Sequence, residues 1–74
     1  MEKAKFRREL LETQSELQRL AYKLTSDKET ANSLLVETTR KALEERKEYT
    51  PETSMKHWTS MLMYGIFAER NKES

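Results

Sequence analysis

At 74 residues, the chain is too short for more than one domain, and a domain of this size buries only about 60% of the surface that its unfolded chain exposes. The absence of Cys excludes disulfide bridges and thiolate metal sites. With one Gly, one Pro and 36% charged residues, the composition favours a small all-α bundle over a β-sheet. The formal net charge of +1 argues against strong sequence-independent binding of nucleic acid, which an excess of Lys and Arg would supply.

The first part of the chain predicts a helix over residues 4–24. Its apolar residues recur mainly at spacings of three, four and seven, which places them on one stripe of a helix. This stripe consists of Phe6, Leu10, Leu17, Leu20, Ala21 and Leu24. The charged residues between them form an ordinary solvated helix surface.

A second helix is predicted over residues 27–47. Ser26 and Glu29 have the spacing of a capping box, in which each side chain satisfies a free backbone N–H at the start of the helix. The expected buried stripe is Ala31, Leu34, Leu35, Thr38 and Ala42, with Leu43 at its margin. The opposite side of this helix, with Val36 and Glu37, should face outward.

A connector and a third helix over residues 54–71 follow. Pro51 lacks a backbone N–H and biases Thr50 away from helical geometry, so Thr50 or Thr53 is expected to cap the next helix. The apolar face of that helix is expected to hold Trp58 as the central core aromatic. Its members are Met55, Trp58, Leu62 and Ile66, with Met61 and Phe67 as further candidates. Met63 and Tyr64 should lie on the outer face, where two large residues mark a contact patch.

The sequence shows no constellation for catalysis. His57 is the only histidine, and a lone histidine on a helix is more often structural than a ligand. The only glycine, Gly65, lies within a helical run, so there is no glycine-rich loop for phosphate. We expect no enzyme activity, no cofactor and no metal. The absence of a signal peptide and of a long apolar run predicts a cytoplasmic protein that does not cross the membrane.

Two segments carry a family resemblance, TSDKETA at residues 25–31 and YTPETSMKHW at residues 49–58. With the apolar residues around them, they resemble region 2 of the extracytoplasmic-function group of bacterial sigma factors, over nearly the whole chain. This resemblance implies a three-helix bundle that acts in transcription. Its implied partners are RNA polymerase core, promoter −10 DNA and an anti-sigma factor. The further sigma domain that reads the −35 element is not expected in this chain.

In that family, the second helix docks on the clamp coiled coil of the polymerase. The resemblance assigns this role to the segment 32–38, where the apolar pair before Val36 and the carboxylate of Glu37 match the family pattern. Asn32 and Ser33 stand where the family usually has an acidic pair, and Val36 stands where it has glutamine. The implied polymerase-binding residues are Asn32, Ser33, Leu35, Val36 and Glu37.

The family's connector holds a base that is flipped out of the promoter −10 element. Tyr49, Pro51 and Thr53 match the family pattern, whereas Glu52 replaces a glycine and Gly65 replaces an asparagine. The implied DNA-binding residues are Tyr49, Thr50, Thr53, Ser54, Lys56 and Tyr64, and Arg70 would join Lys56 in neutralising phosphates. Tyr49 would either stack on the base or pack against Pro51.

Two functions of different classes remain open. The first is a sigma-region-2-like domain that binds polymerase core and −10 DNA. The second is a degenerate relative that binds polymerase, an anti-sigma factor or a second copy of itself without reading a promoter. Its contact residues would be Leu35, Val36, Met63 and Tyr64, and the missing acidic pair and asparagine favour it. An accidental likeness of an unrelated bundle is a third alternative.

Overall fold

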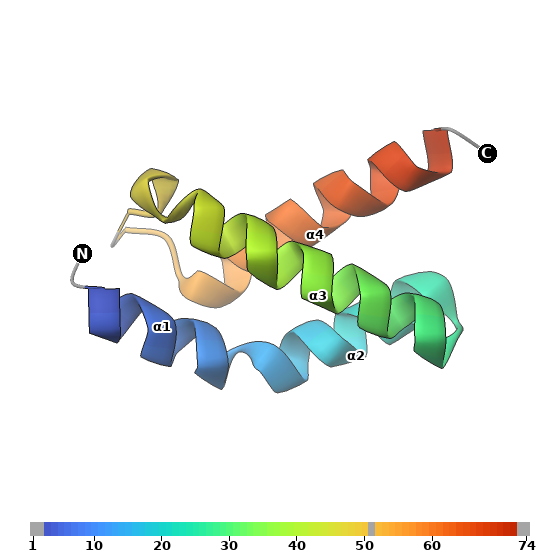
Figure 1. Ribbon diagram of the computed structural model, residues 1–74, viewed down its shortest axis with the longest axis horizontal. Helices are drawn as coiled ribbons and strands as arrows, with labels where there is room; N and C mark the ends of the chain where they lie inside the picture. Colours follow the sequence, from blue (N-terminus) through green and yellow to red (C-terminus); the bar gives the residue numbers. More distant parts are fainter. Residues whose placement is uncertain (1–2, 51, 73–74) are drawn as a thin grey trace.

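The computed structural model describes residues 3–50 and 52–72. Within them the chain forms α1 (Lys3–Glu12), α2 (Gln14–Thr25), α3 (Lys28–Glu44), the short 3₁₀ helix η1 (Arg46–Glu48) and α4 (Met55–Lys72), with no strand. The predicted all-α bundle is confirmed. Figure 1 shows α1 and α2 lying end to end, α3 crossing in front of α4, and the C-terminal half of α4 diverging from α3.

The predicted first helix is interrupted at Thr13, which is buried. Its hydroxyl donates to the Glu9 carbonyl oxygen (2.7 Å), the acceptor that the Thr13 N–H would use in an uninterrupted α-helix. The Thr13 N–H bonds to the Leu10 carbonyl oxygen instead, at 3.2 Å. The same hydroxyl bond occurs at Thr38 and Thr59 without a break, so the change in the backbone bond at Thr13 is what divides the expected single helix into α1 and α2.

The corner between α2 and α3 is built by Ser26 and Asp27. Ser26 takes the left-handed conformation (φ 56°) and ends α2, while the Asp27 side chain accepts the Thr30 N–H at 2.8 Å and caps α3. The expected capping box of Ser26 with Glu29 is therefore wrong by one residue. Hydrogen bonds from the Thr30 hydroxyl and then from its backbone N–H hold the pKa of Asp27 below its ordinary value.

Two apolar clusters form the core. The first joins α2, α3 and α4 and contains Leu17, Ala21, Ala31, Leu34, Met63 and Ile66. The second lies toward the N-terminal end of α1 and contains Phe6, Leu10, Ala42, Tyr49 and Met55. The predicted stripes of the first two helices are confirmed in their main positions, while Leu20, Leu24 and Leu35 are only half-buried. Leu43 is exposed.

The buried face of α4 differs from the predicted one. It consists of Met55, Thr59, Met63 and Ile66, at spacings of four, four and three. Thr59 is buried because its hydroxyl donates to the Met55 carbonyl oxygen (2.7 Å) and so leaves no unpaired polar atom in the core. Met63, expected on the outer face, is 0% exposed, and Met61 is 58% exposed. Trp58 is half-buried at the edge of the second cluster.

None of the helices within residues 3–50 and 52–72 has both the length and the apolar character needed to cross a membrane.

Candidate functional site

The connector residue Tyr49 is buried, with only 8% of its surface exposed. Its ring meets Phe6 edge-on, with centroids 5.8 Å apart, and lies tilted against Trp58 at 5.3 Å. Its hydroxyl donates to Glu9 Oε1 at 3.3 Å. The expected exposure of the connector is therefore wrong at Tyr49, and of the two alternatives for this ring the structure shows packing, against Phe6 and Trp58. Pro51, the other expected packing partner, lies outside the described residues.

This environment gives Tyr49 a measurable pH dependence. Burial raises the pKa of its phenol above the ordinary value, and the neighbouring Glu9 carboxylate adds to the rise by its charge and by accepting the hydrogen bond. Because the pKa of Tyr49 is higher in the folded state, its neutral phenol contributes its full stabilisation below the unfolded-state pKa of about 10. This contribution is lost as the pH rises through the folded-state pKa.

We therefore expect the free energy of unfolding to fall above about pH 10 more steeply in the native chain than in Tyr49→Phe. Urea denaturation at a series of pH values between 8 and 12 measures the difference. The Phe variant keeps the ring and removes the titrating group, so it controls for the lysines and for the other two tyrosines. Parallel curves for the two proteins would contradict the buried, Glu9-bonded phenol.

The remaining residues of the implied DNA-binding set are dispersed or engaged. Ser54, rather than Thr50 or Thr53, caps α4, because its Oγ accepts the His57 N–H at 3.1 Å. Lys56 pairs with Glu16 Oε2 at 3.2 Å. Thr50 is exposed and Thr53 is half-buried. Tyr64 is exposed, but it lies ten residues beyond Ser54, about 15 Å along the helix axis.

The implied polymerase-binding residues lie along the outer side of α3. Asn32, Ser33, Val36 and Glu37 are exposed, whereas Leu35 is half-buried against the first cluster. Ser33, Val36 and Glu37 share one surface feature, a groove of about 810 Å³ between α3 and α4. The structure thus brings these three residues together and leaves Asn32 and Leu35 out of the groove lining.

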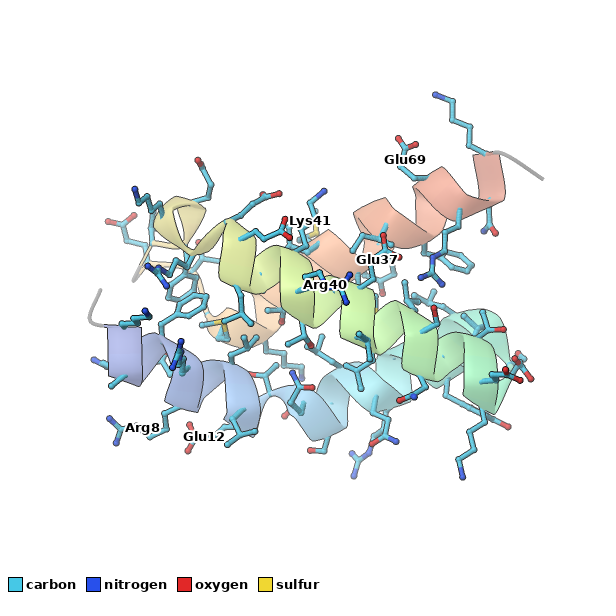
Figure 2. The ribbon with its side chains drawn as sticks, viewed as in Figure 1. Arg8, Glu12, Glu37, Arg40, Lys41 and Glu69 are labelled. Atoms are coloured by element: carbon cyan, nitrogen blue, oxygen red, sulfur yellow. The ribbon has the colours of Figure 1, made fainter. Side chains whose placement is uncertain are left out.

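The groove opens where α4 diverges from α3. Figure 2 shows Glu37, Arg40 and Lys41 on α3 and Glu69 on α4 at this place, whereas Arg8 and Glu12 point away from the bundle on α1. The groove is lined by Ser33, Val36, Glu37, Arg40, Lys41, Glu44, Glu45, Gly65, Ile66, Glu69 and Arg70.

One wall of the groove is tied to the other by Arg70. Its Nη2 contacts Glu37 Oε1 at 2.5 Å and Ser33 Oγ at 3.2 Å, so a cation on α4 holds two side chains of α3. This pairing competes with the expected role of Arg70 in phosphate neutralisation. Because the pair is at the surface, its contribution to stability is small.

The groove lining includes three residues without a polar side chain, Val36, Gly65 and Ile66, which we call its floor. Val36 is 49% exposed, and it lies beside Gly65 and the buried Ile66. A Cβ placed on Gly65 would have no atom of this chain within 4 Å, so the internal packing of the bundle does not require glycine there. An unforced glycine within a helix costs about 1 kcal/mol relative to alanine, and it permits close approach of another backbone.

The α4 wall of this groove was missed in the sequence because the apolar face of α4 was placed on the wrong residues. The lone glycine in the middle of a helical run was the available signal.

Among the described residues, no three His, Asp or Glu side chains are grouped to hold a metal ion. Comparison of the chain with models of protein families, with curated proteins and with solved structures gives no match.

Proposed function

We propose that the chain is a sigma-region-2-like protein-interaction module that binds the clamp of RNA polymerase core through the α3–α4 groove and does not read a promoter. One observation carries this proposal. The groove contains Ser33, Val36 and Glu37, three of the five residues to which the family resemblance assigns polymerase binding. The shape of the surface and the family resemblance are separate observations, and both point to this part of α3.

The chemistry of the groove suits a helical partner of mixed charge. Its rim carries four carboxylates and three cations, so it complements a surface that presents both signs. Its floor of Val36, Gly65 and Ile66 accepts a small apolar side chain, and the missing Cβ at Gly65 lets a helix backbone come close. The clamp coiled coil that the family resemblance supplies as partner is helical.

We do not propose that the connector binds promoter −10 DNA, because several of its implied DNA-binding residues are engaged within the bundle. Tyr49 is enclosed by Phe6 and Trp58, and Lys56 and Arg70 are paired with carboxylates. With a net charge of only +1, the chain has no general excess of cations with which to replace them at the connector.

Replacing Val36 by Asp tests the proposal. We expect affinity for bacterial core RNA polymerase to fall by about ten- to a hundredfold, because a buried unpaired charge costs about 1–3 kcal/mol or more and each 1.4 kcal/mol is tenfold. The measurement is a fluorescence titration of labelled chain with core enzyme. Leu11→Asp is the matched control, since Leu11 is 73% exposed and lies on α1, away from the groove.

Gly65→Ala provides a second, stabilising variant for the same titration. It is expected to raise the free energy of unfolding by about 1 kcal/mol and to weaken polymerase binding, since the new methyl group occupies the groove floor. Equal affinities of the native chain, Val36→Asp and Gly65→Ala would remove the groove as the binding surface. Failure of the native chain to bind core enzyme at all would remove the proposed function.

A further inference from the structure

A second surface feature lies on the outer side of α2, away from the α3–α4 groove. Residues 15, 18, 19, 22 and 23 recur at the spacing of one helix face, and Lys28 from the start of α3 completes the patch. They line a hollow of about 670 Å³. The α2 face, as we call it, consists of Ser15, Gln18, Arg19, Tyr22, Lys23 and Lys28.

The centre of the α2 face is an unengaged aromatic ring. The side chain of Tyr22 is 55% exposed. Within residues 3–50 and 52–72 it makes no ring contact and no side-chain hydrogen bond, in contrast to the enclosed Tyr49. A flat ring with a free face is a platform on which a planar group can stack.

Three cations surround this ring. Among the described residues, no carboxylate lies within ion-pair distance of Arg19, Lys23 or Lys28. Asp27 and Glu29 adjoin Lys28 in the sequence, and the carboxylate of Asp27 is occupied by the Thr30 hydroxyl at 2.6 Å and backbone N–H at 2.8 Å. The positive charge of the α2 face is therefore not neutralised within ion-pair distance.

Helix electrostatics accounts for only part of this arrangement. Lys23 in the last turn of α2 is favourable, because cations stabilise the C-terminal end of a helix. Lys28 is the first residue of α3, where the helix dipole disfavours a cation. Neither argument explains an exposed tyrosine between the two. A ligand with negative charge and a flat ring accounts for all of these features.

We propose that the α2 face binds single-stranded nucleic acid. A base stacks on Tyr22, and phosphates on either side of it are neutralised by Arg19, Lys23 and Lys28. The amide of Gln18 lies on the same face and can hydrogen-bond to a base edge. A membrane surface is a poorer match, since Tyr22 is the only large apolar or aromatic side chain of the face. The proposal goes beyond polymerase binding and does not depend on it.

The test compares two labelled strands of equal length, a ten-residue oligothymidylate and its abasic analogue, titrated against the full chain at low salt. With three phosphates neutralised, the logarithm of the binding constant should fall with the logarithm of salt concentration with a slope of about −2. Tyr22→Ala should weaken binding of oligothymidylate by about 5- to 150-fold, the measured range for one stacked base. It should leave binding of the abasic strand unchanged, and Tyr22→Phe should bind as the native chain does.

A matched pair of triple variants tests the cations. Combined replacement of Arg19, Lys23 and Lys28 by Ala should abolish the salt dependence and reduce binding of both strands. The control removes the same charge from α1, by replacing the exposed Lys5, Arg7 and Arg8 with Ala, and should keep the native affinity. All six side chains are exposed, so circular dichroism should show an unchanged fold for both variants.

Several results would overturn the inference. One is the absence of any binding at low salt, and another is an equal loss in the two triple variants, which would indicate only a general charge effect. A third is an equal effect of Tyr22→Ala on the two strands, because no base would then stack on the ring. Binding of anionic phospholipid vesicles that depends on Tyr22, without binding of oligothymidylate, would assign the face to a membrane surface instead. Val36→Asp should not change oligonucleotide binding, which separates this test from that of polymerase binding.

Discussion

Replacing Phe6 by Ala should lower the free energy of unfolding by about 3–5 kcal/mol, the usual cost of removing a buried phenyl ring. Phe6 is buried, and it meets both Tyr49 and Trp58 edge-on, with ring centroids 5.8 Å and 6.0 Å apart. A domain of this length has a total stability of roughly 4–11 kcal/mol at 0.05–0.15 kcal/mol per residue. The substitution should therefore remove a large part of it.

Urea denaturation followed by the fluorescence of Trp58 measures this effect directly, because Trp58 is the only tryptophan and contacts Phe6. Tyr22→Ala is the control, since it also deletes an aromatic ring but from an exposed position and should stay within about 0.5 kcal/mol. If the two variants were equally stable, Phe6 would not hold the aromatic cluster together. Tyr49 would then be free to leave the core, and the base-stacking role implied by the family resemblance would return.

The buried stripes of α1, α2 and α3 could be predicted because their apolar residues repeat clearly. Leu17, Ala21, Leu34 and Ala42 all lie on the stripes that the spacing defined, and all are buried. What the spacing could not reveal was the break at Thr13. At that break the Thr13 N–H bonds to the Leu10 carbonyl oxygen, and a change in backbone hydrogen bonding gives no signal in hydrophobic periodicity.

The corner after α2 shows a similar limit. Ser26 and Asp27 are both good caps by residue type, and only the left-handed backbone at Ser26 decides that Asp27 starts α3. The capping-box spacing identified the right place in the chain and the wrong residue. Sequence patterns locate helix ends to within a residue or two, and the local dihedral angles decide the rest.

Of the candidate site, the α3 wall could be predicted from the sequence, whereas the α4 wall and the position of Tyr49 could not. The family resemblance placed Ser33, Val36 and Glu37 on a binding surface, and these residues do line the groove. The opposite wall depends on which side of α4 faces the core, and the spacing of its large apolar residues predicts a face that lacks the buried Thr59 and Met63. The position of Tyr49 depends on how the connector folds back onto Phe6, a contact between residues that are more than forty positions apart in the chain.

The orientation of α4 about its axis makes the sharpest prediction. Met63→Ala should cost about 2–5 kcal/mol of unfolding free energy, because Met63 is fully buried in the first cluster between α2, α3 and α4. Met61→Ala should be nearly neutral, since Met61 is 58% exposed and alanine is the better helix former. The two variants delete the same side chain two residues apart, so their difference reports burial alone. Chemical denaturation of both proteins measures it.

If Met61→Ala lowered the free energy of unfolding more than Met63→Ala, the candidate site as well as the core would have to be revised. It would mean that α4 is turned toward the face expected from its large apolar residues, with Met63 and Tyr64 outward. Gly65, Glu69 and Arg70 would then leave the groove wall together, because residues on one helix turn as a unit. The measurement on two methionines that lie outside the groove lining therefore tests whether α3 and α4 form the proposed polymerase-binding surface.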